Sequence, residues 1–256
     1  MYRDAPWPQT VTGVASVLAI FAHPDDESLA AGGALALSAA RGHRVSLLCL
    51  TRGEGRSLVP AEAEGVAHIR ARELDAAARC LGIATVRLEA FRDGYLPWED
   101  GGLIRSRIRA MMDEVQASVV VTFDEDGLYW HPDHIAVHQH VMAAVADMGA
   151  TAPAVYGVTM PPGRMRELAS GMPVLGIEAD AFGAEAPAPT WRLNIAAVLD
   201  IKVKALRQHR SQVTDDPLDS ASSAQMMAAL GTEQYRLVHP GAGGIDWQQS
   251  LEEQHD

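Results

Sequence analysis

The stretch VLAIFAHPDDE, residues 17–27, joins an apolar run directly to one histidine and three carboxylates. The apolar half has the length and composition of a buried β-strand. The polar half crowds like charges together, which is unfavourable in a folded protein unless a cation or water compensates them. The stretch therefore predicts a strand that ends at a functional site holding a positive group.

The rest of the chain repeats this alternation of strand-like and helix-like segments. The expected strands are 14–22, 45–51, 83–88, 118–123 and 155–159, with a last short one at 234–238. The expected helices are 29–40, 61–81, 103–115, 134–148 and 195–209. This rhythm predicts an α/β fold, a single Rossmann-like domain whose mostly parallel sheet has helices on both faces.

The 256 residues are enough for one large domain with a good core. We expect that domain at 14–240, between an N-terminal extension at 1–13 and a flexible tail at 241–256. The segment 161–190 is rich in proline, glycine and alanine and has no clear periodicity. It is predicted to be a long loop and a candidate lid over a binding site.

Composition narrows the classes of partner. The chain is 48% hydrophobic with a mean hydropathy of -0.03, as in soluble globular proteins. Its formal net charge of -12 disfavours nucleic acid and anionic lipid as partners. No apolar run approaches the roughly 20 residues that span a bilayer, and the start MYRDAPWPQT has no apolar signal core. We expect a cytoplasmic protein that acts on a small molecule, with homo-oligomerisation left open.

Two clusters of imidazole and carboxylate groups follow predicted strands. His23, Asp25 and Asp26 follow the first strand, and DEDGLYWHPDH, residues 124–134, follows the strand at 118–123. Ligands of open α/β sheets bind at the carboxyl ends of strands, so both clusters should meet at one edge. Imidazole and carboxylate together suit a borderline divalent cation such as Zn²⁺.

A catalytic zinc keeps about three protein ligands and one open position. His23, Asp26 and His134 would supply the ligands, which leaves Asp25 as a base for water and His131 as a second titrating group. Each cluster alone has a simpler explanation, a surface histidine pair or an acidic helix cap. Their conjunction at two strand ends favours the metal site.

The sequence resembles the LmbE-like (PIG-L) family of zinc-dependent N-deacetylases through AHPDDE at 22–27 and HPDH at 131–134. Shorter stretches agree with it: TRGEG at 51–55, RARELDAAARCLGI at 70–83, FRDGYL at 91–96 and KALRQHRSQ at 204–212. The family includes enzymes that deacetylate N-acetylglucosamine conjugates. The resemblance implies such a hydrolase, with Zn²⁺, or Fe²⁺ or another divalent metal, as cofactor and a small amino-sugar conjugate as substrate.

The resemblance also implies roles for individual residues. His23, Asp26 and His134 would be the metal ligands, and Asp25 would be the general base. The general acid would be His131, with Asp133 keeping its imidazole protonated.

Three further residues are implied to bind the substrate or the oxyanion. Tyr129 would steady the oxyanion, although Trp130 stands where some relatives have a small residue. Arg70 and Asp93 fall where the family holds sugar hydroxyls. Two alternatives stay open: an amidase that cleaves a larger acyl group or a thiol or antibiotic conjugate, and a metal-stabilised sugar-binding module without turnover. A pure binding site needs no spare base, so the presence of both Asp25 and His131 favours an enzyme.

Overall fold

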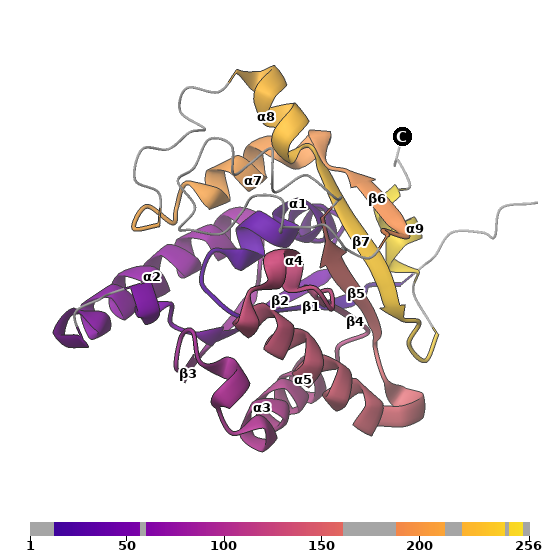
Figure 1. Ribbon diagram of the computed structural model, residues 1–256. Helices are drawn as coiled ribbons and strands as arrows, with labels where there is room; N and C mark the ends of the chain where they lie inside the picture. The colour runs from indigo at the N-terminus through magenta and orange to yellow at the C-terminus, as the bar shows by residue number, and fades with distance from the viewer. Residues whose placement is uncertain (1–12, 57–59, 161–187, 213–221, 244–245, 253–256) are drawn as a thin grey trace, which may run out of the picture.

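The computed structural model describes residues 13–56, 60–160, 188–212, 222–243 and 246–252. The described residues form a seven-stranded sheet in the order β3-β2-β1-β4-β5-β7-β6 (Figure 1). Its strands are β1 (Ser16–Phe21), β2 (Arg44–Thr51), β3 (Thr85–Phe91), β4 (Val119–Phe123), β5 (Ala154–Thr159), β6 (Trp191–Asn194) and β7 (Thr232–His239). The strands β1 to β5 pair in parallel, whereas β7 is antiparallel to both β5 and β6.

Helices cover both faces of this sheet, as Figure 1 shows. On one face α1 (Asp26–Ala40), α2 (Pro60–Leu81) and α7 (Leu199–Leu206) pack against one another, and on the other α3 (Gly101–Val115) packs against α5 (Pro132–Met148). The shorter elements are α4 (Gly127–Trp130), α8 (Ser223–Leu230), α9 (Trp247–Glu252) and the 3₁₀ turns η1 (Glu54–Arg56), η2 (Leu96–Trp98), η3 (Gly149–Thr151) and η4 (Ala196–Val198). The predicted single α/β domain with a mostly parallel sheet is confirmed.

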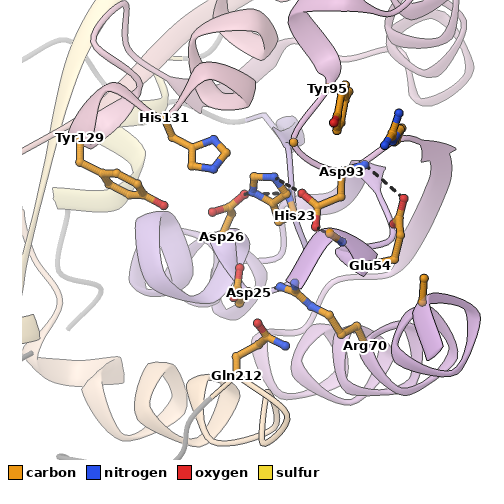
Figure 2. Close-up of a pocket in the computed structure, with 14 residues that line it drawn as sticks. His23, Asp25, Asp26, Glu54, Arg70, Asp93, Tyr95, Tyr129, His131 and Gln212 are labelled. Carbon is orange, nitrogen blue, oxygen red and sulfur yellow. Dashed lines mark hydrogen bonds and ion pairs between the residues drawn. The ribbon is translucent and has the colours of Figure 1, made fainter. Parts of the chain in front are cut away.

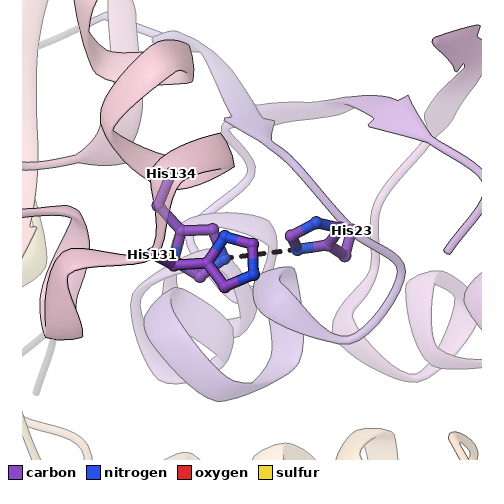
Figure 3. Close-up of side chains that lie close together, drawn as sticks. All are labelled: His23, His131 and His134. Atoms are coloured by element: carbon purple, nitrogen blue, oxygen red, sulfur yellow. Dashed lines mark hydrogen bonds between the residues drawn. The ribbon is translucent and has the colours of Figure 1, made fainter. Parts of the chain in front are cut away.

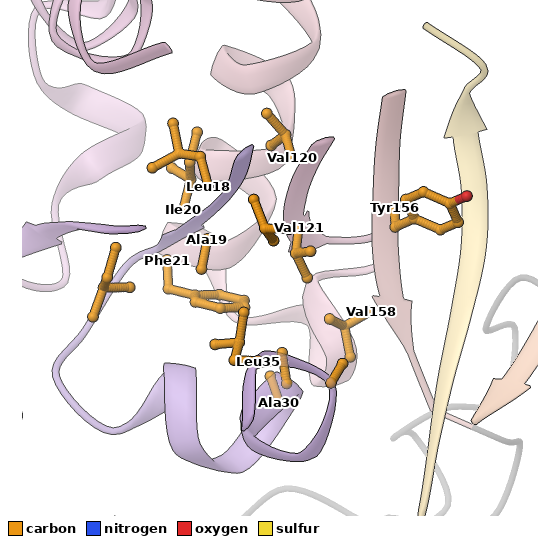
Figure 4. Packing of buried hydrophobic residues seen from close by; sticks show 14 of the residues in the cluster. Leu18, Ala19, Ile20, Phe21, Ala30, Leu35, Val120, Val121, Tyr156 and Val158 are labelled. Carbon is orange, nitrogen blue, oxygen red and sulfur yellow. The ribbon is translucent and has the colours of Figure 1, made fainter. Parts of the chain in front are cut away.

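The core is built around β1, the strand that directly precedes His23, Asp25 and Asp26. All six residues of β1 are buried, and Figure 4 shows Leu18, Ala19, Ile20 and Phe21 among the packed side chains. The ring of Phe21 meets that of Phe123 edge to face at 5.0 Å. Helix α1 is rich in alanine and glycine, which lets the segment before η4 pack closely against it. A side chain added at Gly33 would place its Cβ 2.5 Å from Ile195. Burial on every side therefore fixes the end of β1 and the start of α1, where the acidic cluster lies.

Helix starts differ from the sequence expectation in a way that matters for the site. The first helix begins at Asp26 rather than at 29, and α5 begins at Pro132 rather than at 134. Acidic residues and proline are both favourable in a first helical turn. Several of the predicted site residues are therefore held in or next to helical first turns.

The C-terminal part of the chain departs more from expectation. The predicted helix 195–209 is shorter, since η4 precedes α7, while β6 and α8 were not predicted. Part of the predicted flexible tail is ordered, because Trp247 is fully buried and its Nε1 donates to Ser38 Oγ at 3.0 Å. A lone tryptophan in a polar segment gives no periodic signal, so only the packing shows it.

The predicted extension at 1–13 lies outside the described residues except for residue 13, and the candidate lid at 161–190 except for 188–190. Across the part of the chain that the structure describes, no helix is both long and apolar enough to cross a membrane.

Candidate active site

Loops that follow parallel strands meet at one edge of the sheet and surround a cavity of about 670 Å³ (Figure 2). Most of the residues predicted from the sequence line it: His23, Asp25, Asp26, Arg70, Asp93, Tyr129 and His131. The other two, Asp133 and His134, are fully buried and contact His23. The structure thus brings all nine predicted residues together.

The turn between β1 and α1 is strained. Asp25 caps α1 with a φ of 127°, a backbone conformation that non-glycine residues rarely adopt. Its carbonyl accepts the N–H groups of Ser28 and Leu29 at 3.1 and 3.0 Å. Asp26 Oδ2 accepts the N–H of His23 at 2.7 Å, which closes the turn on itself. These bonds place the histidine and both aspartates within one short segment.

The side chains of His23, Asp26 and His134 lie against one another. His134 Nε2 is 3.2 Å from His23 Nδ1 and 3.4 Å from Asp26 Oδ1, and His23 Nδ1 is 3.4 Å from Asp26 Oδ2 (Figure 3 shows the histidines). Neighbouring ligands of a tetrahedral Zn²⁺ at ordinary bond lengths are about 3.3 Å apart. The spacing of the three groups therefore fits a bound divalent cation.

The outward-facing nitrogens of the two imidazoles already have acceptors. His134 Nδ1 lies 3.1 Å from the carbonyl oxygen of Gly127, and His23 Nε2 lies 3.0 and 3.1 Å from the carboxylates of Asp93 and Asp133. Each of these nitrogens carries the hydrogen, so in the neutral rings the two facing nitrogens present lone pairs to each other. Facing lone pairs beside a carboxylate are favourable only with positive charge between them, which either a bound metal ion or an added proton on one ring can supply.

The surrounding charges favour positive charge at this position. Burial lowers the pKa of His23, but hydrogen bonds to Asp133 and two further aspartates outweigh burial and raise it well above its ordinary value. Burial lowers the pKa of His134 to about 4, so its ring is neutral near pH 7. Burial raises the pKa of Asp26, but the two histidines outweigh it and hold the carboxylate ionised.

Asp25 lies beside these three groups and faces the cavity with its side chain 32% exposed. Burial and the charge of Asp26 raise the pKa of Asp25 to about 7, against the opposing charge of Arg70. A carboxylate that titrates near neutrality is suited to take a proton from water.

Arg70 is held under the loops rather than out in the cavity. It is only 4% exposed, and its guanidinium donates to Asp25 Oδ2 at 3.1 Å, to the carbonyl oxygen of Gly53 at 2.9 Å and to that of Pro24. Gly53 has a φ of +70°, and a side chain there would overlap the guanidinium. The predicted contact between Arg70 and sugar hydroxyls stays a prediction, beside this observed contact with Asp25.

Asp93 and Asp133 lie on the other side of the His23 ring. Asp93 also accepts the N–H of Gly55 at 2.8 Å, and Asp133 accepts those of Gly94 and Leu96 at 2.7 and 3.0 Å. A carboxylate behind a metal-binding histidine fixes its tautomer and raises its basicity. The family resemblance predicted that Asp133 would keep the imidazole of His131 protonated. In the structure the Asp133 carboxylate instead contacts His23.

His131 caps α5 and faces the cavity. Its Nδ1 accepts the backbone N–H of Asp133 at 3.2 Å, so the neutral ring carries its hydrogen on Nε2. Burial and the charge of His23 lower the pKa of His131, while the charge of Asp133 opposes them. Nitrogens of His23, His131 and His134 also lie within 4.8 Å of one another, which makes His131 an alternative third ligand.

Tyr129 stands beside both histidines of the second motif. Its ring is 5.1 Å from that of His134 and 5.9 Å from that of His131. Burial and nearby carboxylates raise the pKa of Tyr129, so its hydroxyl stays a proton-bearing donor. The flanking Leu128 and Trp130 have φ values of 67° and 57°, so this short turn is strained like the one at Asp25.

Comparison with known proteins identifies the family of this chain. The family model described as PIG-L, GlcNAc-PI de-N-acetylase, matches residues 18–145, which contain both histidine motifs. This chain belongs to the PIG-L family.

Relatives of this PIG-L chain carry deacetylase names. The 1D-myo-inositol 2-acetamido-2-deoxy-alpha-D-glucopyranoside deacetylase of Kineococcus radiotolerans is 30% identical over 89% of this chain and 78% of its own length. The probable N-acetyl-alpha-D-glucosaminyl L-malate deacetylase 2 of Bacillus cereus is 37% identical over 77% of this chain and 83% of its own. Both names describe N-acetylglucosamine-type conjugates.

Solved structures share the PIG-L fold at lower identity. The N,N'-diacetylchitobiose deacetylase of Pyrococcus horikoshii has a TM-score of 0.65 and 21% identity, and the match covers 86% of this chain and 82% of that one. GalB, a 4-carboxy-2-hydroxymuconate hydratase of Pseudomonas putida, has a TM-score of 0.60 and 20% identity, covering 91% and 99%. Such likeness establishes the fold alone. Because a hydratase shares that fold, the reaction has to be argued from the site.

Several residues of this PIG-L site had no predicted role. Glu54, Tyr95 and Gln212 line the cavity, and each lies in a stretch that carries the family resemblance, TRGEG, FRDGYL or KALRQHRSQ. His209, in the last of these stretches, is buried with its Nε2 2.8 Å from Glu27 Oε1. Burial lowers the pKa of His209, but Glu27 outweighs it and raises that pKa. The stretches that resemble the family therefore indicated where these residues lie in the chain, but not which side chains they would contact.

Proposed function

We propose that this protein is a metal-dependent N-deacetylase that removes the acetyl group from an N-acetylglucosamine-type amino sugar joined to a small acceptor. The observation that carries the proposal is the pair of facing imidazole nitrogens beside the Asp26 carboxylate, with Asp25 and His131 on the cavity side. The names of the sequence relatives support the substrate class.

Zn²⁺ is our proposed cation, because two imidazoles and one carboxylate form a ligand set of borderline softness. Fe²⁺ suits the same set and is the alternative. The ligands in this proposal are His23 Nδ1, His134 Nε2 and Asp26. A bound divalent cation would polarise the amide carbonyl and make water acidic enough to attack near neutral pH.

The chain's own groups would move the protons of amide hydrolysis. Asp25 would take the proton of the attacking water, and Arg70 would hold the Asp25 carboxylate in place through the observed 3.1 Å bond. His131, once protonated to the imidazolium, would supply the proton that the departing amine needs and return to its neutral form. Each such transfer is typically worth about 10²- to 10⁴-fold in rate.

Tyr129 and Asp93 are proposed to act on the substrate itself. The Tyr129 hydroxyl, kept protonated, would donate to the amide oxygen as negative charge develops there. Asp93 lines the cavity and would accept a hydrogen bond from a sugar hydroxyl, in addition to holding His23.

The test is acetate release by purified protein loaded with Zn²⁺ or Fe²⁺. The substrates are N-acetylglucosaminyl inositol, N-acetylglucosaminyl malate, N,N'-diacetylchitobiose and a simple N-acetyl amine. We expect turnover of at least one sugar conjugate, its loss after chelation and its return with metal. An N-butanoyl analogue of the best conjugate separates a deacetylase from an amidase of larger acyl groups. Metal binding without release of acyl acid from any of these would contradict the proposal and support a binding module.

A further inference from the structure

Several hydrogen bonds hold the backbone of Asp25 in its strained conformation, and one of them is donated by its own N–H. At a φ of 127°, relaxation toward the common backbone regions is favourable unless surrounding contacts prevent it. The N–H of Asp25 donates to Glu27 Oε2 at 3.0 Å, which bridges the turn from its first residue to the start of α1. The direction of the Asp25 carboxylate therefore depends on where the Glu27 carboxylate lies.

Glu27 is itself held from a distant part of the chain. Its side chain is buried, with 1% of the residue exposed, and its Oε1 receives the Ser28 hydroxyl at 2.5 Å and His209 Nε2 at 2.8 Å. Ser28 is its chain neighbour, whereas His209 is 182 residues away and 1% exposed. A buried carboxylate needs such donors to stay in place. His209 is the donor that fixes Glu27 relative to the rest of the molecule.

A second bond docks the same late segment on α2. Ser211 donates to Glu73 from its backbone N–H at 2.8 Å and from its hydroxyl at 2.6 Å. This bond involves exposed side chains and does not touch Glu27 or Asp25, so it serves as an internal control for docking alone.

We propose that His209 and Glu27 are a positioning pair for the reaction, which together hold the Asp25 backbone so that its carboxylate faces the attacking water. This inference rests on the proposed function, because it assigns Asp25 the role of base. The chain of contacts runs from His209 Nε2 to the Glu27 carboxylate and from there to the Asp25 N–H.

The test compares His209→Phe, which keeps ring volume but removes the donor, with His209→Gln, which keeps an N–H donor. Displacement of a base by about 1 Å can reduce a rate by about 10²-fold, so we expect kcat of His209→Phe to fall about 10- to 100-fold. The KM and the bound metal should stay near wild type, and His209→Gln should recover most of the rate. Glu73→Ala, which removes both docking bonds from Ser211, should keep the wild-type kcat. His209→Leu is a second donor-free variant if the Phe variant does not fold.

Combination with Asp25→Asn separates positioning from general loss of structure. If His209 acts through Asp25, loss of the donor costs almost nothing further once the base is gone. The proposal would be overturned if the effects of the two substitutions multiply, if kcat is unchanged in the donor-free variants, or if Glu73→Ala loses as much kcat as they do.

Crystal structures give a readout that does not depend on turnover. We expect Asp25 to keep its positive φ in His209→Gln and to leave it in the donor-free variant. An unmoved Asp25 would overturn the positioning role even if the wild type hydrolyses none of the conjugates, an outcome that by itself defeats only the proposed function.

Discussion

Two regions of the molecule bury carboxylates, and they satisfy them differently. Glu233 on β7 receives protein donors on both oxygens: the N–H groups of Gly33 and Ala34 at 2.7 and 2.8 Å, Lys202 Nζ at 2.6 Å and the Tyr235 hydroxyl at 2.7 Å. Asp26, at the start of the same helix α1, instead faces two histidines whose ring nitrogens oppose each other. The Glu233 carboxylate is paired by protein donors on both oxygens, whereas the Asp26 region, with its facing histidines, could accept a metal ion or an added proton.

The difference shows how one helix serves stability and function. Around its middle, α1 is fixed by Glu233 and by the aromatic cluster in which Tyr235 lies 5.2 Å from Trp191. At its start, the chain carries the strained Asp25 and the crowded charges. A site can hold strain and unpaired ligands when neighbouring structure determines its geometry. If the two regions are independent, substitutions near Glu233 should change stability alone and substitutions near Asp26 should change activity.

The largest effect is expected from His134→Ala, which removes one of the facing nitrogens. Loss even of an outer partner weakens metal binding by about 10- to 100-fold, so loss of a ligand should exceed that and abolish turnover. Elemental analysis and circular dichroism should show a folded protein without metal. The matched control is His138→Ala, because His138 bonds the carbonyl oxygen of Phe123 at 3.0 Å and should not be needed for metal. Full metal content in His134→Ala would refute the ligand assignment.

Asp25→Asn should separate the base from its neighbouring ligand. We expect it to keep its metal and to lose about 10²- to 10⁴-fold in kcat, the range for a lost general base. Steady-state kinetics with parallel metal analysis measures both. A near-normal rate would remove Asp25 from the mechanism, and lost metal would make it a ligand instead.

Glu233→Ala tests the other region. It leaves Lys202 buried without its carboxylate, and breaking a buried pair costs about 3–5 kcal/mol of the free energy of unfolding. Denaturant titration should show this loss, while kcat measured well below the unfolding midpoint stays close to wild type. A parallel collapse of kcat would mean that the two regions are coupled through α1 and that the comparison fails.

Arg70→Ala and Asp93→Ala should differ in how strongly they affect each substrate. Arg70 bonds Asp25, so its loss should slow a sugar conjugate and a simple N-acetyl amine alike. Asp93→Ala also removes a carboxylate behind His23, so it should slow both substrates. The lost hydrogen bond to a sugar hydroxyl should cost the sugar conjugate about 1–3 kcal/mol more, or roughly 5- to 150-fold in kcat/KM. A loss in Arg70→Ala confined to the sugar conjugate would support the sugar contact predicted from the sequence.

The last prediction concerns pH and stability in protein stripped of metal. The pKa of Asp25 is raised from 3.8 to about 7, so the folded state holds its proton more tightly than the unfolded chain. Between these two values stability must therefore fall as pH rises. We expect the free energy of unfolding of the wild type to decline relative to Asp25→Asn from pH 4 to pH 8. A flat difference across this range would show that Asp25 is not strained by its charge.

Much of the fold and the membership of the site follow from local sequence patterns. The alternation of strands and helices predicted the parallel sheet because burial imposes a period on each segment. Clusters after two parallel strands predicted a shared site because parallel strands end at the same edge. The grouping of His23, Asp26 and His134 needed only these two facts, while their role as ligands stays a prediction.

Only the tertiary structure decided which partner each charged group meets. It turned the Asp133 carboxylate to His23, put Arg70 under Asp25, buried Trp247 and brought His209 to Glu27 across 182 residues. Periodicity reports whether a residue is buried, since that depends on its own segment. The partner of a buried polar group depends on how distant segments of the chain pack together. A local sequence pattern gives no information on that packing.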